Sequence, residues 1–522
     1  MSEGLKTAVM ESAERIPSDN RQEDVLHLPG DDLEVGQLKQ RTAQGALIST
    51  GAQIATFVLR TGSMVILARL LIPKDFGLVG MVTAFTGFLA LFRDVGLSMA
   101  TVQRASITRE QTSTLFWINL ALGGALGVLC VVLAPAVAAF YGEPRLFWVT
   151  VAMGLGFIFN GASVQHRALL QRAMRFASLA VIDIICLTIS IVAGIAVAAS
   201  GLGYWSLVVS AVSLPALSIA GVWLAARWLP GLPRRGSGIR SMLRYGGTVT
   251  LNNVIVYFAY NIDKILIGRV WGAETLGVYG RAYYLINLPT ENLNATIGLV
   301  AFPALSRIQN DPVRLRSYFL KGYGFFLSLI VPLTMGCALF ANDIIRVFLG
   351  PKWHEAASVF RLLSPTIFVF ALINPLAWLM LATGHAARSL KMALVIAPVV
   401  IVGYALGLQY GPKGVAAGFS IAMLLLLVPM MLWAKHGSLI TNGDLFKVIL
   451  QPFSAVLIAA AITVLLKPWW HGFSPAILRL SVGCILLFGV YFGTLLFVMG
   501  QRDVFLDTIR QTHLWPAGRR KK

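Results

Sequence analysis

Three cationic side chains lie within long apolar segments of the sequence, namely Arg60, Lys264 and Arg281. A charge at the centre of a bilayer costs about 2.5–3.5 kcal/mol on insertion scales, so such residues usually face a cavity or an opposite charge. Arg60 is in the middle of its segment, which favours a position in a cavity. Lys264 and Arg281 are near the ends of theirs, where extension of the side chain to the outer interface is an equal alternative.

Polar and aromatic side chains share the helical faces of two of these cations, because residues three and four apart lie on one side of a helix. The first face consists of Gln53, Phe57, Arg60 and Met64. The second face consists of Asn253, Tyr257, Tyr260 and Lys264. Guanidinium groups pair with phosphate oxygens, while tyrosine rings can stack on sugars and amides bond to hydroxyls. The two faces therefore predict a cavity for a ligand that carries phosphate and sugar.

Carboxylates within the apolar segments are candidates for ion coupling. Asp183 could hold a proton or Na⁺, but an ion pair with Arg175 is favoured. Asp263 could also couple an ion, or it could neutralise a neighbouring cation. Arg93 and Asp94 lie at the cytoplasmic end of the second apolar segment, where they form either a local ion pair or a gate between two halves of the protein.

Motifs of enzymes and of cofactor sites are missing from the sequence. No Gly-Lys dipeptide occurs, which excludes a Walker A ATPase motif, and neither HExxH nor GxSxG is found. The cysteines stand singly in apolar runs, which favours packing over a metal site. We therefore predict no catalytic residue, no metal and no cofactor.

Composition identifies the kind of molecule that must position these residues. The 522 residues are 57% hydrophobic and only 13% charged, with a mean hydropathy of +0.74. Soluble domains carry about 25% charged residues, so a soluble enzyme is excluded. The formal charge of +20 does not indicate nucleic acid binding, because no basic run lies on a soluble module. The chain is predicted to be an all-α integral membrane protein.

A helix that crosses a bilayer needs about 20 mostly apolar residues. The sequence predicts about fourteen such helices, at 46–69, 77–99, 114–140, 146–164, 177–199, 202–229, 248–270, 277–305, 318–341, 357–382, 388–410, 412–434, 446–467 and 476–499. Loops after even-numbered helices hold nineteen Lys and Arg residues, against ten after odd-numbered helices. Because cytoplasmic loops are rich in cations, both termini are predicted to be cytoplasmic.

An internal repeat with an offset of 200 residues divides the chain. Residues 66–80 match 266–280, and the pairs include Arg69 with Arg269 and Gly77 with Gly277. Six helices per half would give two lobes of the same orientation, a parallel repeat known from many transporters. The predicted parts are a cytosolic disordered tail at 1–44, an N-lobe at 45–229, a basic cytosolic linker at 230–246, a C-lobe at 247–434, two further helices at 435–500 and a basic cytosolic tail at 501–522.

Several stretches carry a resemblance to a known family. The stretch LARLLIPKDFGLVGMVTAF begins at residue 67, and DKILIGRVWGAETLGVYGRAYYLINLP covers 263–289. Together with APAVAAFYGEPRL at 134–146 and FPALSRIQND at 302–311, they resemble polysaccharide flippases of the MOP superfamily, with the Wzx branch nearest. The resemblance covers roughly 45–435. It implies a MATE-like fold in the inner membrane of a bacterium.

The resemblance also implies a function, namely flipping of undecaprenyl-diphosphate-linked oligosaccharide by alternating access through a cationic lumen. The expected partners are this lipid-linked glycan, the bilayer, and polysaccharide polymerase and export proteins; the protein is expected to be a monomer. A MATE-type drug antiporter would need buried carboxylates, and residues 45–500 hold only twelve acidic residues. A glycan polymerase or ligase is disfavoured because the longest outer loop, 342–356, is short. A flippase for the peptidoglycan precursor is disfavoured by the likeness to the exopolysaccharide branch.

Overall fold

The structure is a computed structural model of the chain, and it describes residues 35–93, 98, 101–102, 107–233 and 240–502. Nearly all of these residues are helical, and no strand occurs among them. The prediction of an all-α protein is therefore confirmed.

Six long helices lie in the described part of the first half. They are α2 (Val35–Leu70), α3 (Pro73–Ala90), α5 (Arg109–Tyr141), α6 (Leu146–Arg172), α7 (Phe176–Ala199) and α8 (Trp205–Ala226). Local sequence sets several of their ends. At the start of α5 the Thr108 side chain accepts a hydrogen bond from the Gln111 amide, and the Gln111 side chain accepts from the Thr108 amide. Gly142 then ends α5 in a left-handed conformation with φ 66°.

The second half begins with one very long helix, α9 (Arg240–Arg307), which breaks at Gly272 with φ 79°. We call residues 240–271 its first limb and residues 273–307 its second limb. The helices that follow are α10 (Pro312–Leu339), α11 (Ala341–Phe348), α12 (Ala356–Leu363), α13 (Pro365–Ala382), α14 (Ala386–Leu408), α15 (Gly411–Lys435), α16 (Asn442–Leu466), α17 (Pro468–His471) and α18 (Ala476–Gly493).

Each predicted membrane span overlaps a helix of the structure, and the spans 248–270 and 277–305 are the two limbs of α9. Among the described residues, eleven helices are long and apolar enough to cross a membrane, judged by length and composition. The count of fourteen stays a prediction. The expected outer loop at 342–356 is folded, since it contains α11 and a short 3₁₀ turn.

Two helices begin earlier than expected. α2 starts at Val35, so part of the predicted disordered tail at 1–44 is helical. α9 starts at Arg240, so it includes the end of the predicted linker at 230–246. The reason is physical, because Gln, Lys, Arg and Leu extend a helix readily once an apolar segment has nucleated it.

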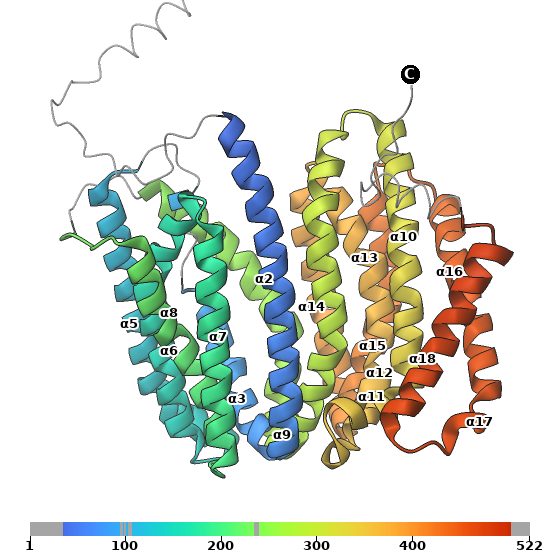
Figure 1. Cartoon of the computed structure of the whole chain (residues 1–522), viewed down its shortest axis with the longest axis horizontal. Helices are drawn as coiled ribbons and strands as arrows, with labels where there is room; N and C mark the ends of the chain where they lie inside the picture. Colours follow the sequence, from blue (N-terminus) through green and yellow to red (C-terminus); the bar gives the residue numbers. More distant parts are fainter. Residues whose placement is uncertain (1–34, 94–97, 99–100, 103–106, 234–239, 503–522) are drawn as a thin grey trace, which may run out of the picture.

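The helices form two groups with α2 and α9 between them (Figure 1). In the first group α5 packs on α6, and α8 packs on both α6 and α7. In the second group α14 and α13 pack on α15, while α10 packs on α16 and α16 on α18. α3 joins the groups, because it packs along α9. The space between the groups is where the cations on α2, α6 and α9 lie.

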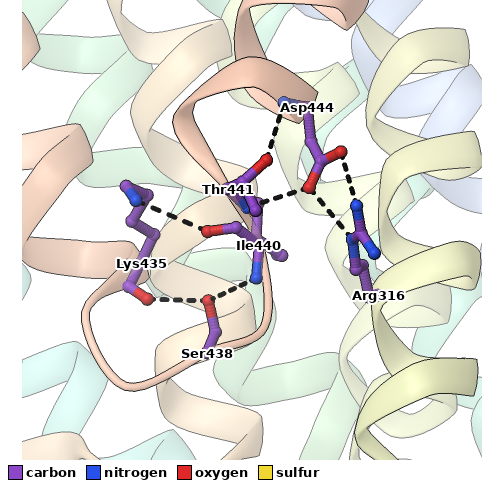
Figure 2. A network of polar contacts seen from close by, with 6 residues as sticks. All are labelled: Arg316, Lys435, Ser438, Ile440, Thr441 and Asp444. Carbon is purple, nitrogen blue, oxygen red and sulfur yellow. Dashed lines mark hydrogen bonds and ion pairs between the residues drawn. The ribbon is translucent and has the colours of Figure 1, made fainter.

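The last helices are attached to the second group by a polar network (Figure 2). Asp444 accepts two hydrogen bonds from the Arg316 guanidinium on α10, from Nη2 at 2.7 Å and from Nε at 2.9 Å. The Asp444 side chain also accepts from the Thr441 amide at 2.9 Å, and the Thr441 hydroxyl accepts from the Asp444 amide. One carboxylate therefore caps α16 and also holds it against α10.

Candidate functional site

Two adjoining cavities lie between the helix groups. The first, of about 520 Å³, lies between α2, α6, α7 and the second limb of α9, and we call it the Arg60 cavity. The second, of about 540 Å³, lies between α3 and both limbs of α9, and we call it the Lys264 cavity. Tyr284, Leu288 and Glu291 line both cavities, so the second limb of α9 is a common wall.

α2 contributes its predicted polar face to the Arg60 cavity. Gln53, Phe57 and Arg60 line it, and all three side chains are exposed. Met64, the last residue of the predicted face, is buried in the core instead. Among the described residues, Arg60 has no carboxylate partner. Its charge is therefore available to a ligand in the cavity.

Lys264 lies on the wall of the second cavity, and no acidic side chain among the described residues forms an ion pair with it. Its Nζ donates to the side-chain oxygen of Asn261 at 2.7 Å and lies 5.0 Å from the centre of the Tyr283 ring. A ring face attracts a cation and leaves its positive charge uncompensated. Lys264 can therefore still attract an anion.

Arg281 is held in the same way on the second limb of α9. Its guanidinium carbon lies 4.5 Å from the centre of the Phe76 ring and 5.2 Å from that of Tyr284. In the described part of the chain it forms no salt bridge, and it lines the Lys264 cavity. Stacking between aromatic rings fixes the plane of the guanidinium while its N–H groups stay available. For Lys264 and Arg281 the alternatives were a position in the cavity and extension of the side chain to the outer interface. This geometry favours the cavity.

The predicted face around Tyr257 is only partly directed at the cavity. Tyr257 lines the Lys264 cavity, and its hydroxyl donates to the Ala84 carbonyl at 2.6 Å. Tyr260 points elsewhere, because its ring packs against Phe370 and Phe419 in the second helix group. Asn253 lies in α9, but its side chain is outside the part of the chain that the structure describes.

Asp183 has a different partner from the one expected. It forms an ion pair with Arg167, whose Nη2 also donates to the Ser218 hydroxyl at 3.0 Å. Arg175 donates instead to the Ala225 carbonyl at 2.7 Å. The predicted pairing with Arg175 was therefore wrong, because α6 continues to Arg172 and carries Arg167 into the bundle. No proline or glycine follows Gly161 in α6, and this signal could have predicted the longer helix.

Asp263 is fully buried and does not form a direct ion pair with Lys264. One carboxylate oxygen accepts from the Tyr279 hydroxyl at 2.7 Å, while Oδ1 has no hydrogen-bond partner within the described part of the chain. The Tyr404 hydroxyl on α14 is also buried and has no hydrogen-bond partner among the described residues. Tyr279 and Tyr404 were not predicted, since nothing in their local sequence indicates which buried group they approach.

Arg93 is half-buried at the end of α3, and its Nη1 lies 3.5 Å from the side-chain oxygen of Asn160. Asp94 lies outside the described residues. The alternatives of a local ion pair and a gate therefore stay predictions.

Comparison with known proteins places the chain in a family. Residues 66–358, more than half of the chain, match the family described as polysaccharide biosynthesis protein. The chain is 25% identical over 398 residues to the lipopolysaccharide biosynthesis protein WzxC of Escherichia coli (strain K12), which covers 74% of this chain and 80% of that protein.

Solved structures share the fold at low sequence identity. The lipid II flippase MurJ in an inward closed conformation matches with a TM-score of 0.69 and 15% identity, covering 88% of this chain and all of that one. An inward-facing multidrug resistance MATE family transporter of the MOP superfamily matches with a TM-score of 0.55 and 16% identity, covering 73% and 94%. The predicted MATE-like fold is confirmed. The chain is thus a multi-pass membrane protein that belongs to the polysaccharide biosynthesis protein family.

Proposed function

We propose that this protein flips undecaprenyl-diphosphate-linked oligosaccharide repeat units across the bacterial cytoplasmic membrane for the synthesis of exopolysaccharide, capsule or O-antigen. The observation that carries the proposal is a pair of adjoining cavities within a helical membrane protein, lined by three cations that have no acidic partner among the described residues. Membership of the polysaccharide biosynthesis family supports a glycan as the cargo. The protein acts as a transporter and not as an enzyme.

The two cavities suit different parts of such a substrate. Lys264 and Arg281 would bind the diphosphate, since ammonium and guanidinium groups form strong charge-assisted hydrogen bonds with phosphate oxygens. Arg60, Gln53 and Glu291 would bind the sugar hydroxyls, because they supply donors and acceptors along the adjoining wall. The substrate would then cross while its charged and polar groups remain out of the hydrocarbon.

Alternating access between two lobes is the proposed mechanism of movement. The N-lobe would comprise 45–229, the C-lobe 247–434 and the appended helices 435–500, with both termini in the cytoplasm. The excess of cations in the loops after even-numbered helices supports this orientation. The protein would act as a monomer beside polysaccharide polymerase and export proteins.

Ion coupling is best assigned to Asp263 rather than Asp183. Asp183 is neutralised by Arg167, whereas Asp263 is fully buried and its Oδ1 has no hydrogen-bond partner in the described part of the chain. A proton or a monovalent cation would suit this carboxylate. No group of three or more His, Cys, Asp and Glu side chains with metal-site geometry occurs among the described residues, which offers no support for a divalent ion.

The test is deletion of the gene in its bacterium followed by extraction of polyprenyl-linked glycans. Completed repeat units that accumulate on the cytoplasmic face would support flipping, and the same strain carrying the intact gene is the control. Incomplete units, or completed units on the outer face, would overturn the proposal in favour of an enzyme. A strain with normal glycans and increased sensitivity to cationic drugs would instead indicate the MATE-type antiporter.

A further inference from the structure

The repeated segments 66–80 and 266–280 meet each other in the folded protein. A Cβ atom added at Gly77 would lie 1.6 Å from the carbonyl oxygen of Ala273. A Cβ atom added at Gly277 would lie 1.8 Å from the carbonyl oxygen of Pro73. The two contacts are equivalent, because Gly77 matches Gly277 and Pro73 matches Ala273 at an offset of 200 residues. Each half of the repeat therefore packs its glycine against the backbone of the other half.

A second pair of equivalent positions, nine residues before these glycines, also contacts the opposite half of the chain. The carbonyl of Ala68 accepts a hydrogen bond at 2.8 Å from the indole of Trp353, which is fully buried beyond α11. Gly268 is its counterpart, and a Cβ there would lie 2.9 Å from the Tyr141 ring at the end of α5. Positions 68 and 268 therefore each contact the opposite half of the chain.

The paired arginines extend this pattern by one more position. Arg69 donates to the Val347 carbonyl of α11 at 2.9 Å. Arg269 lies with its guanidinium carbon 5.6 Å from the centre of the Phe140 ring of α5. The segments that match in sequence are thus also a place where the two halves of the chain touch.

This contact closes one end of the Lys264 cavity. Phe76, Gly277 and Arg281 line that cavity, and Phe76 also packs edge to face on Trp353 with ring centres 5.4 Å apart. The contact lies where α2 ends and α3 begins, and where α9 breaks at Gly272, at the lower end of the bundle in Figure 1. On the proposed orientation, this is the outer face of the membrane.

We propose that residues 68–77 and 268–277 form a twofold outer gate, closed in this structure, that must separate for the substrate to leave the cavity outward. Gly77 and Gly277 permit closure because the carbonyls of Ala273 and Pro73 occupy the space that a Cβ at either position would need. Backbone carbonyls cannot move aside without displacing whole helices in a packed interior. The gate rests on the proposed transport function, but its closure can be measured without any substrate.

The experiment measures access to the cavity from outside. Thr83 is an exposed residue of the cavity wall, so Thr83→Cys is made in a chain whose four native cysteines are replaced by alanine, and intact cells are treated with a membrane-impermeant maleimide. We expect Gly77→Ala and Gly277→Ala each to raise the labelling rate about tenfold, as a shift of about 1.4 kcal/mol in the equilibrium between closed and open gates would do. The matched control is Gly62→Ala in α2, where an added Cβ meets nothing within 4 Å.

Equal effects of the two glycine variants are the central expectation, because the repeat makes their contacts equivalent. Unchanged labelling in either variant, with normal amounts of inserted protein and full labelling after permeabilisation, would overturn the gate. Trp353→Phe removes the hydrogen bond to Ala68 and replaces the buried indole with a smaller ring that can still pack on Phe76, and we expect it to raise labelling by a smaller factor. If deletion of the gene leaves the glycans unchanged but the glycine variants still increase labelling, the gate is retained and the proposed cargo is rejected.

Discussion

At the scale of single residues, two of the cavity cations contact ring faces and, among the described residues, form no ion pair with a carboxylate. Lys264 lies over Tyr283, and Arg281 lies between Phe76 and Tyr284. A carboxylate partner would cancel the positive charge, whereas a ring quadrupole stabilises it and leaves it able to attract an anion. In contrast, Arg167 beside Asp183 is neutralised on the wall of the same cavity. The chemistry of the site therefore depends on which cations lack an acid.

Arg60 gives the first prediction. We expect Arg60→Ala to abolish glycan export while the protein remains folded and inserted, because an exposed cavity side chain contributes little to packing. Polysaccharide output and the amount of protein in the membrane fraction are the two measurements. Arg314→Ala, at an exposed position outside both cavities, is the matched control. Normal output from Arg60→Ala would remove Arg60 from the substrate site.

Asp263 gives the second prediction. We expect Asp263→Asn to fold, because an amide oxygen can still accept the hydrogen bond from Tyr279, and to lose coupling of transport to an ion gradient. In membrane vesicles with a fluorescent lipid-linked glycan, wild-type flipping should respond to ionophores that collapse the proton or Na⁺ gradient, and the variant should not. Asp183→Asn serves as the comparison. An unaltered ionophore response in Asp263→Asn would exclude this carboxylate from coupling.

At the scale of elements, α9 decides which side chains reach the cavity. Its break at Gly272 turns the chain so that Lys264 on the first limb and Arg281 on the second line one cavity. A straight helix of this length would carry the second limb away from the first, because it rises 1.5 Å per residue. The end of α2 and the start of α3 form the counterpart turn, with Ile72 in an extended conformation.

The attachment of α16 to α10 gives a third prediction. We expect Arg316→Ala to lower the thermal unfolding temperature of the detergent-solubilised protein, because Asp444 loses two charge-assisted hydrogen bonds. Arg316→Lys should recover only part of the loss, since an ammonium group cannot form the same fork. Export should fall less than in Arg60→Ala, because this pair lies outside both cavities. An unchanged unfolding temperature would show that packing alone holds α16.

At the scale of the whole molecule, two helix groups face each other across the cavities and touch through the repeated segments. The proposed parallel orientation of the halves would require an even number of spans in each half, and it would place both termini on one side of the membrane. α3 and α9 are packed along each other, so the seam between the groups is also the wall of the Lys264 cavity. Movement of the groups about this seam would change access to the cations.

Topology gives the fourth prediction, at this scale. Green fluorescent protein fused after Lys522 should fluoresce, because it folds in the cytoplasm, whereas alkaline phosphatase fused there should be inactive. The same two reporters fused after Gly350, in the segment between α11 and α12, should give the reverse pattern. The opposite result at either site would contradict the orientation inferred from the loop cations.

The sequence by itself determined the class of fold and the positions of most helices, because bilayer thickness and hydrophobicity act on each segment independently. It also revealed the repeat, since matching residues can be found without knowing their contacts. It also indicated Arg60, Lys264 and Arg281 as cavity candidates, since a charge in an apolar segment is costly wherever it lies. Only the tertiary structure decided that Asp183 pairs with Arg167, that Tyr260 packs into the second helix group and that Asp263 meets Tyr279. Those outcomes depend on contacts between segments far apart in the chain, and helical periodicity gives the face of a residue but not the neighbour that this face meets.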